Sequence, residues 1–264
     1  MCLILFAAHA HPAYPLIVAA NRDESYSRPA ASARFWEDDP RICGGRDLEF
    51  GGTWLALSTA GRFAAITNYR QRPRAPRGER SRGELTRAFL QGSESAPVYL
   101  RDVERRSDSY TGFSLIVGNM RELWFYSNRG SVPQRIALGV HGLSNHLMDE
   151  PWPKVLRGIR VLKSLLGAGE TELVTSLTEL LGDRTPAPDH LLPSTGLDPQ
   201  RERAVSASFI PGDTYGTRAS TIVLVRADGH VVFREQLFGP GGVPEGCTEL
   251  KFELNPAAAL QGEA

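Results

Sequence analysis

Apolar residues in this chain fall mostly into short runs of strand length, separated by turns that are rich in glycine, proline and polar residues. Two pairs of runs flank turns that end in glycine, Thr59 to Gly61 and Ala227 to Gly229, and such turns are typical of β-hairpins. The pattern predicts strands at 3–8, 16–20, 54–58, 62–67, 113–118, 123–127, 141–144, 204–210, 220–226 and 231–236.

Helical spacing is concentrated in the middle of the chain. Residues 153–166 have apolar side chains every three or four positions, with a proline at the start and a glycine after the end. Ser81 followed by Glu84 is a capping-box pattern, which predicts a helix from Ser81 to about Gly92. Further helices are predicted at 97–106 and 173–181.

The segments between these elements are expected to be irregular at 28–53 and 183–203, and the tail at 256–264 is expected to be frayed. Because hairpins rather than crossover helices join the strands, the sheets should be mainly antiparallel and the fold class α+β. We find no internal repeat and no linker, so we expect one domain over residues 1–264.

The charge balance gives no global support for nucleic-acid or membrane partners, which only a local patch could serve. Basic and acidic residues number 30 each, so global electrostatics favours neither nucleic acid nor an anionic membrane. Three scattered cysteines suit a reducing compartment, so we expect a cytoplasmic protein. Residues 3–20 are apolar but interrupted by prolines and lack a basic start, so we predict strands rather than a signal peptide or a membrane span. An exported form is the less favoured alternative, and the oligomeric state stays open.

Cys2 is the first candidate for chemistry. Removal of Met1 would place its thiol beside a free α-amine, whose ordinary pKa of about 7.7–8.0 lets it accept the proton of the nucleophile. The simpler interpretation is a small buried residue at the start of an edge strand.

Polar clusters end several of the predicted strands. Asn21 to Glu24 follows the second run, and Asn21 and Asp23 should share one strand face with Arg22 on the other. Asn68 and Asn145 end two further runs and carry amides suited to an oxyanion, although asparagine is also common in turns. Arg218 precedes a late strand and is suited to a carboxylate, a phosphate or Asp23, or is a surface arginine.

Eight short motifs in order give these clusters a common interpretation. They are MCLILF, NRDE, GGTW, TNYR, SRGEL, GLSN, WPK and YGTR. Together they resemble the NRDE family, also called the transport-and-Golgi-organisation protein 2 family, from Met1 to about Phe238. The resemblance implies a four-layer αββα sandwich of the N-terminal-nucleophile (Ntn) hydrolase type, with two antiparallel sheets. Some members of that family are linked to haem mobilisation and others to lipid or acyl-CoA metabolism.

A more distant resemblance is to cysteine Ntn hydrolases such as bile-salt hydrolase and penicillin V acylase. It implies a catalytic set in which an aspartate, two asparagines and an arginine assist the nucleophile: Cys2, Asp23, Asn68, Asn145 and Arg218. Neighbouring side chains are predicted to contact the substrate: Asn21, Arg22, Trp54, Tyr69, Arg70 and Tyr215. One departure is Ala20, where those enzymes usually carry an arginine three residues before the aspartate.

Other features support fewer conclusions. The arginine-rich segment 70–82 is suited to an anionic group, but a solvated loop is the favoured interpretation. His9 and His11 lack a third ligand, so we predict no metal site, and the glycines at 44–52 lack a phosphate-loop signature, so we predict no cofactor.

Two hypotheses follow. The first is a cysteine Ntn hydrolase that cleaves a non-peptide amide or a thioester of a small molecule. The second is a binding or carrier protein that holds an acyl-CoA, haem or a related amphipathic anion without cleaving it. Fold alone does not choose between them.

Overall fold

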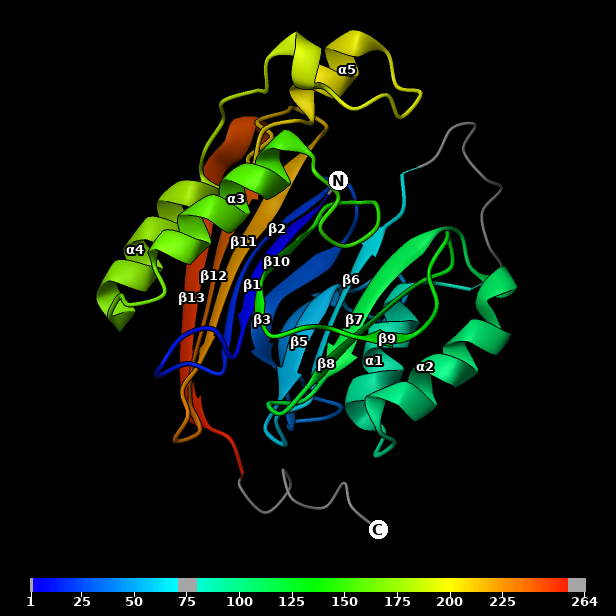
Figure 1. Ribbon diagram of the computed structural model, residues 1–264, viewed down its shortest axis with the longest axis vertical. Coiled ribbons are helices and arrows are strands. Elements are labelled where there is room, and N and C mark those ends of the chain that lie inside the picture. The colour runs from blue at the N-terminus through cyan, green and yellow to red at the C-terminus, as the bar shows by residue number, and fades with distance from the viewer. Residues whose placement is uncertain (1, 71–79, 256–264) are drawn as a thin grey trace.

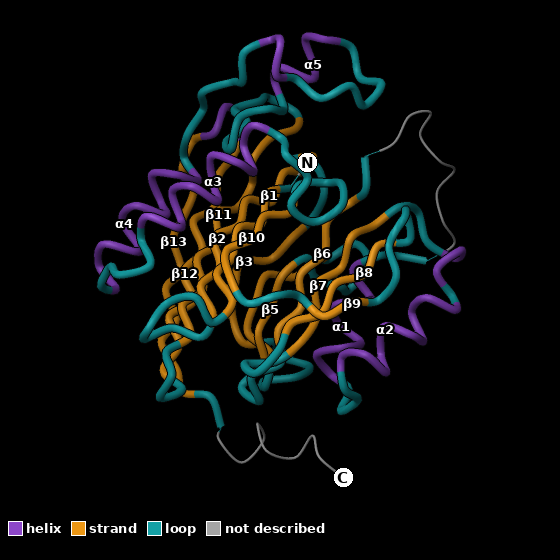
Figure 2. Tube along the Cα trace, viewed as in Figure 1, coloured by secondary structure: helices purple, strands orange, loops and turns teal. Residues whose placement is uncertain are grey.

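Two antiparallel β-sheets packed face to face form the centre of the molecule (Figures 1 and 2). The computed structural model describes residues 2–70 and 80–255. In that part of the chain, the first sheet has the order β10 (Gly139–Leu143), β1 (Leu3–Ala8), β2 (Leu16–Ser25), β11 (Tyr215–Val225), β12 (His230–Gly239), β13 (Val243–Glu253). The second has the order β3 (Ala30–Phe35), β4 (Ile42–Asp47), β5 (Leu55–Ser58), β6 (Phe63–Asn68), β7 (Phe113–Gly118), β8 (Leu123–Ser127), β9 (Gln134–Arg135).

Helices cover the outer face of each sheet. The first sheet carries α3 (Pro153–Ser164) and α4 (Glu170–Leu181), and the second carries α1 (Gly83–Gln91) and α2 (Ala96–Arg105) (Figure 1). A short helix, α5 (Pro199–Ala204), lies beyond one end of the sheets.

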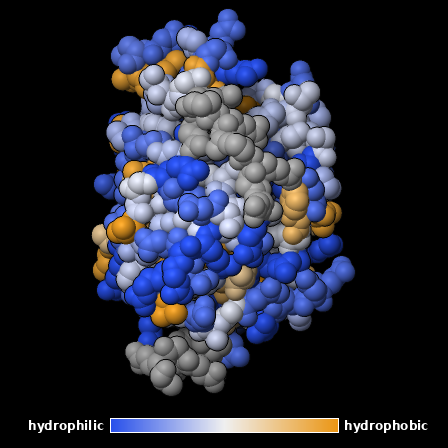
Figure 3. Space-filling view, turned by 90° about the vertical axis from the view of Figure 1, so that its right-hand side faces the viewer, coloured by the Kyte–Doolittle hydropathy of each residue, from blue (hydrophilic) through white to orange (hydrophobic). Residues whose placement is uncertain are grey.

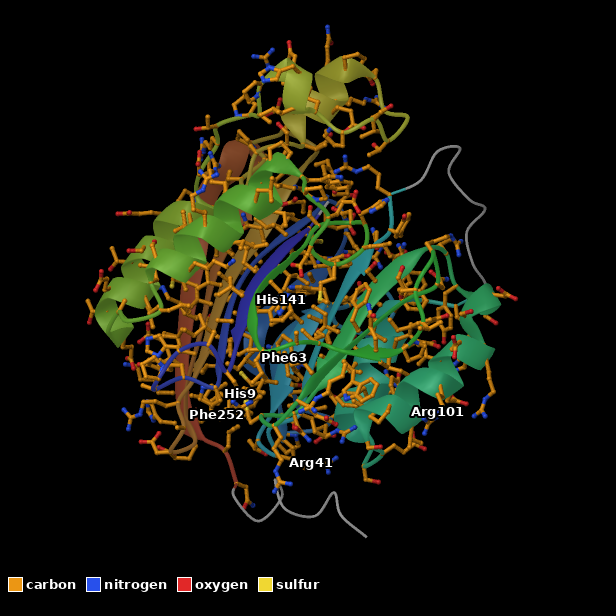
Figure 4. All side chains as sticks on the ribbon, in the orientation of Figure 1. His9, Arg41, Phe63, Arg101, His141 and Phe252 are labelled. Carbon is orange, nitrogen blue, oxygen red and sulfur yellow. The ribbon has the colours of Figure 1, made fainter. Side chains whose placement is uncertain are left out.

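Three apolar layers hold these elements together, because alternate side chains of each strand face opposite ways. Phe6 and Phe63 belong to the layer between the sheets, where Figure 4 shows Phe63. Leu5 packs under α3 and α4, and Phe89 of α1 packs against the second sheet. The expected αββα arrangement with antiparallel sheets is therefore confirmed.

The expectation that residues 28–53 are irregular was wrong, since β3 and β4 lie there. Their glycines hid the strand pattern but are required by packing. A Cβ on Gly45 would lie 2.1 Å from the ring of Trp54, and one on Gly44 would lie 2.5 Å from Ala56 Cβ. Close approach of this kind is a common reason for glycine inside a strand.

The predicted strand at 204–210 was also wrong. Its backbone bonds to other partners, with Phe209 N donating to Asp183 O at 2.9 Å, so no sheet ladder forms. The loop expected at 183–203 contains α5, where the Asp198 carboxylate accepts from Arg201 N at 2.9 Å and Pro199 follows at the first helical position.

Three further differences between the predicted and observed elements concern the ends of elements and the edge of a sheet. β2 runs on to Ser25 because β11 pairs along its whole length. The edge strand β13 is missing from the prediction because its side chains are mostly polar and exposed. The capping box at Ser81 does not form, since α1 begins at Gly83 and the Glu84 carboxylate pairs with Arg80 at 2.6 Å.

Two predictions lie outside the described residues, namely most of the arginine-rich segment, 71–79, and the tail at 256–264. None of the helices in the described part of the chain is both long and apolar enough to cross a bilayer. The face shown in Figure 3 is mostly hydrophilic, with hydrophobic residues in small separate spots.

Candidate functional site

Cys2 precedes β1 and faces the space between the two sheets. Leu3 packs under the helices and Ile4 packs between the sheets, so alternation puts the Cys2 side chain on the side of Ile4. Leu3 pairs with Asn21 across β1 and β2, which sets Cys2 opposite Arg22. The thiol is free and the residue is half-buried.

The loop after β10 holds the backbone of Cys2 at two points. Cys2 N donates to Asn145 Oδ1 at 2.8 Å, and Ser144 Oγ donates to Cys2 O at 2.9 Å. Asn145 has a φ of 56°, in the left-handed region that asparagine tolerates better than most residues. Its Nδ2 donates to the backbone oxygen of Asn68 at 2.9 Å. Asn145 thus bridges the start of β1 in the first sheet to the end of β6 in the second.

Asp23 is buried on the helix-facing side of β2. Its Oδ1 accepts from Thr217 Oγ1 at 2.7 Å, and Tyr215 donates to its backbone oxygen at 3.0 Å. Burial raises the pKa of the Asp23 carboxyl, while Lys154, the Thr217 hydrogen bond and Arg22 oppose that rise. The site therefore combines a costly buried carboxylate with groups that favour its charged form.

The end of β6 supplies the opposite wall. Asn68 is exposed to the cleft, and among the described residues no hydrogen bond occupies its side-chain amide. Next to it, the Tyr69 hydroxyl bonds to His146 Nε2 at 2.7 Å, and His146 Nδ1 bonds to Glu150 at 2.8 Å. The free amide of Asn68 is the group in this wall that is available to a ligand.

A large cleft joins these groups. Its volume is about 1570 Å³, above the roughly 300–1,000 Å³ of ordinary small-molecule pockets. Cys2, Asp23, Asn68 and Asn145 all line it. Its apolar and aromatic lining side chains include Phe50, Trp54, Ile66, Phe209 and Ile210.

The lining of the cleft contains more arginines than acidic residues, although the whole chain has no net charge. Among the described residues that line it, eight are arginines and four are acidic. The arginines are Arg22, Arg28, Arg70, Arg80, Arg82, Arg184, Arg201 and Arg203, and the acids are Asp23, Glu24, Asp47 and Glu49. Arginines gathered in a concave surface raise the local concentration of anions.

Arg22 is the arginine that lies opposite Cys2 in the pairing of β1 with β2. It points away from Asp23, as strand alternation predicts, and its guanidinium lies 4.4 Å from the centroid of the Trp54 ring. The side that it faces is the side of the Cys2 thiol.

Two of the predicted site residues lie elsewhere. Arg218 donates to the backbone oxygens of Ser25 and Arg28, so it holds the chain after β2 and does not pair with Asp23. Asn21 is fully buried beneath α4, where its amide donates to Leu181 O and Ser208 O at 2.8 Å each. Neither is among the described residues that line the cleft. Arg22, Trp54, Tyr69, Arg70 and Tyr215 all line it.

Comparison with known proteins assigns the family. The Transport and Golgi organisation 2 family matches residues 1–240. The chain belongs to this family. The resemblance inferred from the eight motifs is therefore confirmed.

Relatives named for the Transport and Golgi organisation 2 family extend the match. The chain is 39% identical over 256 residues to the Transport and Golgi organization protein 2 homolog of Bos taurus, covering 89% of this chain and 92% of the relative. The Homo sapiens homolog is 38% identical with the same coverage, and the Drosophila melanogaster protein is 28% identical.

Two solved structures are similar at a lower level. One is a Caenorhabditis elegans N-acylethanolamine-hydrolyzing acid amidase ortholog, with a TM-score of 0.47, 12% identity, and coverage of 84% of this chain and 92% of that one. The other is a mutant conjugated bile acid hydrolase from Clostridium perfringens, with a TM-score of 0.45, 10% identity, and coverage of 97% and 93%. Because both TM-scores are below 0.5, neither similarity bears on function.

In this member of the Transport and Golgi organisation 2 family, the structure adds buried groups that the sequence interpretation missed. Lys154 is 3% exposed and lies within electrostatic range of Asp23 and Cys2. Arg70 forms a buried ion pair with Glu202 of α5 at 2.8 Å. Lys154 had a detectable signal, because a lysine in the first turn of a helix is unfavourable and therefore conspicuous. Glu202 lay in a segment expected to be irregular.

Proposed function

We propose that this protein is a cysteine Ntn hydrolase that cleaves a non-peptide amide or a thioester, with Cys2 as the nucleophile. The observation that carries the proposal is the placement of Cys2, whose side chain faces the cleft while Asn145 Oδ1 accepts from its backbone nitrogen at 2.8 Å. Once Met1 is removed, that nitrogen is the α-amine, already held in place beside its own thiol.

The reaction balances without a further base. The thiol proton moves to the α-amine, and sulfur bonds to the substrate carbonyl carbon. When the tetrahedral intermediate collapses, the carbon–nitrogen or carbon–sulfur bond breaks and the leaving group takes the proton from the ammonium. Water then attacks the thioester and gives a proton to the amine. The carbon–sulfur bond breaks, the sulfur takes that proton from the ammonium, and the acid and free Cys2 are released.

Each wall of the cleft has a part in this scheme. Asn68, with its free amide, donates to the oxyanion. Asn145 positions the nitrogen of Cys2, because its oxygen accepts from that nitrogen and its amide is already bonded to Asn68 O. Asp23 stabilises the ammonium form of the amine.

The lining of the cleft supports an amphipathic anion as substrate. Arginines supply bidentate donors for a carboxylate or phosphate, and Phe50, Trp54 and Phe209 supply apolar surface. A fatty-acyl amide or thioester with an anionic head group combines both features.

The first test is the mass of the N-terminus followed by turnover. Intact mass with N-terminal fragmentation should show a chain that begins at Cys2 with a free amine. Anionic acyl amides and acyl thioesters should then be hydrolysed by the parent, with a covalent acyl adduct on Cys2. Cys2→Ala should lose hydrolysis and adduct, whereas Cys247→Ala, which alters an exposed cysteine, should retain both. Retained turnover in Cys2→Ala would falsify the proposal.

The alternative function is a carrier for an amphipathic anion such as an acyl-CoA or haem, favoured by the excess of arginine in a cleft larger than most small-molecule pockets. Calorimetry with a non-hydrolysable acyl thioether analogue separates the two functions. Saturable binding unchanged in Cys2→Ala, with no product from the cleavable thioester on long incubation, indicates a carrier.

We place the protein in the cytoplasm. The proposed mechanism needs a reduced thiol at Cys2, and the three cysteines are all free. A fluorescent fusion at the C-terminus, which leaves Cys2 unobstructed, should distribute with a cytoplasmic marker.

A further inference from the structure

The loop after β10, residues 144–149, carries Asn145 and has an unusual backbone at both ends. Asn145 has a φ of 56° and Asp149 a φ of 58°. Among the described residues, His9 is the only other non-glycine residue with a positive φ. Such backbone persists where surrounding contacts hold it, and it concentrates at functional sites. The contacts of Asp149 must therefore hold this loop in its conformation.

Three bonds join Asp149 to the end of β10. Its backbone nitrogen donates to Gly142 O at 2.8 Å, and its Oδ1 accepts from Gly142 N at 2.8 Å. Its Oδ2 lies 2.7 Å from His141 Nδ1. These bonds close the loop at its base, while Asn145 within it accepts from Cys2 N. The closed loop thus presents the Asn145 side chain to Cys2 in one conformation.

His141, which is labelled in Figure 4, has an acceptor at each ring nitrogen. Nδ1 faces the Asp149 carboxylate, and Nε2 lies 3.0 Å from the backbone oxygen of Ala137. A neutral imidazole has one N–H and can donate to only one of these oxygens, whereas the imidazolium donates to both. The ring also packs against Phe6, with centroids 5.4 Å apart. The geometry therefore fits a protonated His141.

The charged groups that face His141 are Asp149 of the loop and Lys163 of α3. The hydrogen bond to Asp149 raises the pKa of His141, and burial and Lys163 only partly oppose this rise. Asp149 is 41% exposed, so solvent screens its charge and the hydrogen bonds of the ring carry most of the effect. Because the folded chain binds this proton more tightly, the bonds are complete at low pH and are lost as the pH rises through the raised pKa of His141.

We propose that His141 and Asp149 form a pH-sensitive clasp that positions Asn145 against the nitrogen of Cys2. The clasp is closed while His141 is protonated and loosens when that proton is lost. This inference rests on the proposed function, because the position of the nitrogen matters for chemistry only if the nitrogen is the base. High pH favours the neutral amine and low pH favours the closed clasp, so the site works best in a window of pH between the two.

Nuclear magnetic resonance tests the clasp without a substrate. The sample is the full chain with Met1 removed, as verified by mass, labelled with ¹⁵N and ¹³C. The side-chain amide signals of Asn145 should shift with pH at the same midpoint as the ring signals of His141, above the ordinary value of 6.5. Asp149→Asn keeps the shape and tolerates a positive φ, so it should lower the His141 midpoint and abolish the shift of the Asn145 signals.

The matched control is a second histidine–carboxylate pair, which lies away from the loop. His230 Nδ1 lies 3.0 Å from Glu253 Oε1, between β12 and the edge strand β13. Glu253→Gln should therefore leave the titration of the Asn145 signals unchanged.

Acylation by p-nitrophenyl acetate reports the effect of the clasp on chemistry, because attack by Cys2 releases p-nitrophenol. In a Cys247→Ser background, which removes the exposed thiol, the acylation rate of the parent should rise and then fall with pH. Asp149→Asn should slow acylation about tenfold at pH 7 and lose the falling limb while keeping the rising limb. His141→Gln removes the titrating ring and should also lack the falling limb, which provides a second variant if Asp149→Asn does not fold.

Two results overturn the inference: Asn145 signals that do not titrate with His141, and a falling limb that survives in both Asp149→Asn and His141→Gln. The proposed function fails differently. No acylation of the parent, or an equal rate in Cys2→Ala, refutes that function, and the titration of the Asn145 signals then still decides whether the clasp exists.

Discussion

Carboxylates are buried both at the cleft end of the molecule and in the core between the sheets, but the groups that contact them differ. At the cleft end, Asp23 is 4% exposed and Glu202 is 4% exposed, and each has a buried cation nearby, Lys154 or Arg70. In the core, Glu235 is 1% exposed and accepts from Ala33 N at 2.6 Å and from Thr221 Oγ1 at 3.3 Å.

The bond to Glu235 has a structural origin. Pairing between β3 and β4 shifts register between Ala31 and Arg34, which leaves the Ala33 amide without a place in the ladder. Glu235 of β12 accepts from that amide and so joins the two sheets. Burial raises the pKa of Glu235 to about 7, and the hydrogen bonds and Arg22 only partly oppose it.

The comparison shows that equally buried carboxyl groups have different neighbours. Arg70 pairs with the buried Glu202 carboxylate, and Lys154 and Arg22 oppose the rise that burial causes in the pKa of Asp23. The pKa of Glu235 is raised to about 7, which favours a protonated carboxyl below neutral pH and suits a neutral bridge between the sheets. Three substitutions test this difference.

The largest expected effect is on turnover in Asp23→Asn. The asparagine preserves shape but cannot stabilise an ammonium, so kcat/KM for whichever acyl substrate is identified should fall by about 10²–10⁴-fold. Asp102→Asn, on the partly exposed face of α2, is the control and should leave kcat/KM unchanged. Parent-like turnover in Asp23→Asn would show that this carboxylate is structural, like Glu235.

Next is the stability of Glu202→Gln. Removing the charge leaves Arg70 buried 4.5 Å from the Trp152 ring centroid without its carboxylate, so the free energy of unfolding in urea should fall by about 3 kcal/mol. Glu179→Gln on the exposed side of α4 is the matched control. A double change, Arg70→Met with Glu202→Met, should recover most of the loss, and failure to recover would assign the effect to packing.

The smallest expected effect is the pH dependence of Glu235→Gln. The pKa of Glu235 is about 7 in the folded chain and about 4.5 when unfolded, so the folded state binds the proton more tightly. The free energy of unfolding of the parent should therefore fall as pH rises from 5 to 8, and the variant should lack this part of the fall.

Urea midpoints across that pH range measure the difference. The variant should gain about 2 kcal/mol relative to the parent between pH 5 and pH 8. Glu249→Gln on the edge strand β13, which is more exposed, should show no such gain. A pH-independent difference would mean that Glu235 is ionised in both states, as proposed for Asp23.

Prediction from the sequence succeeded where a local pattern carries the information. Hairpin turns located β5 with β6 and β11 with β12, and apolar spacing located α3 and α4. It failed at β3 and β4, whose glycines are explained only by the ring of Trp54 and by Ala56 on the neighbouring strand. The signals for α5, Asp198 followed by Pro199, were present but lay in a polar segment.

The candidate site residues also fall into those that the structure brings to the cleft, as predicted, and those that it places elsewhere. Cys2, Asp23, Asn68 and Asn145 were identified in order along the chain, and the structure brings all four to one cleft. Arg218 and Asn21 belong to the same motifs, yet they bond to backbone oxygens and are not among the described residues that line the cleft. Short motifs record which residues occur together but not which way each side chain points.

The sequence by itself determined the family, the antiparallel strands and the candidate nucleophile, because those depend on residue type and local spacing. Only the tertiary structure decided which charges meet. Cys2 and Asn145 are 143 positions apart, yet pairing of β1 with β10 brings them within hydrogen-bond distance. Pairing of β1 with β2 then places Asp23 in the same cleft. Burial raises the pKa of both Asp23 and Glu235, and the groups that oppose this rise are different at the two positions.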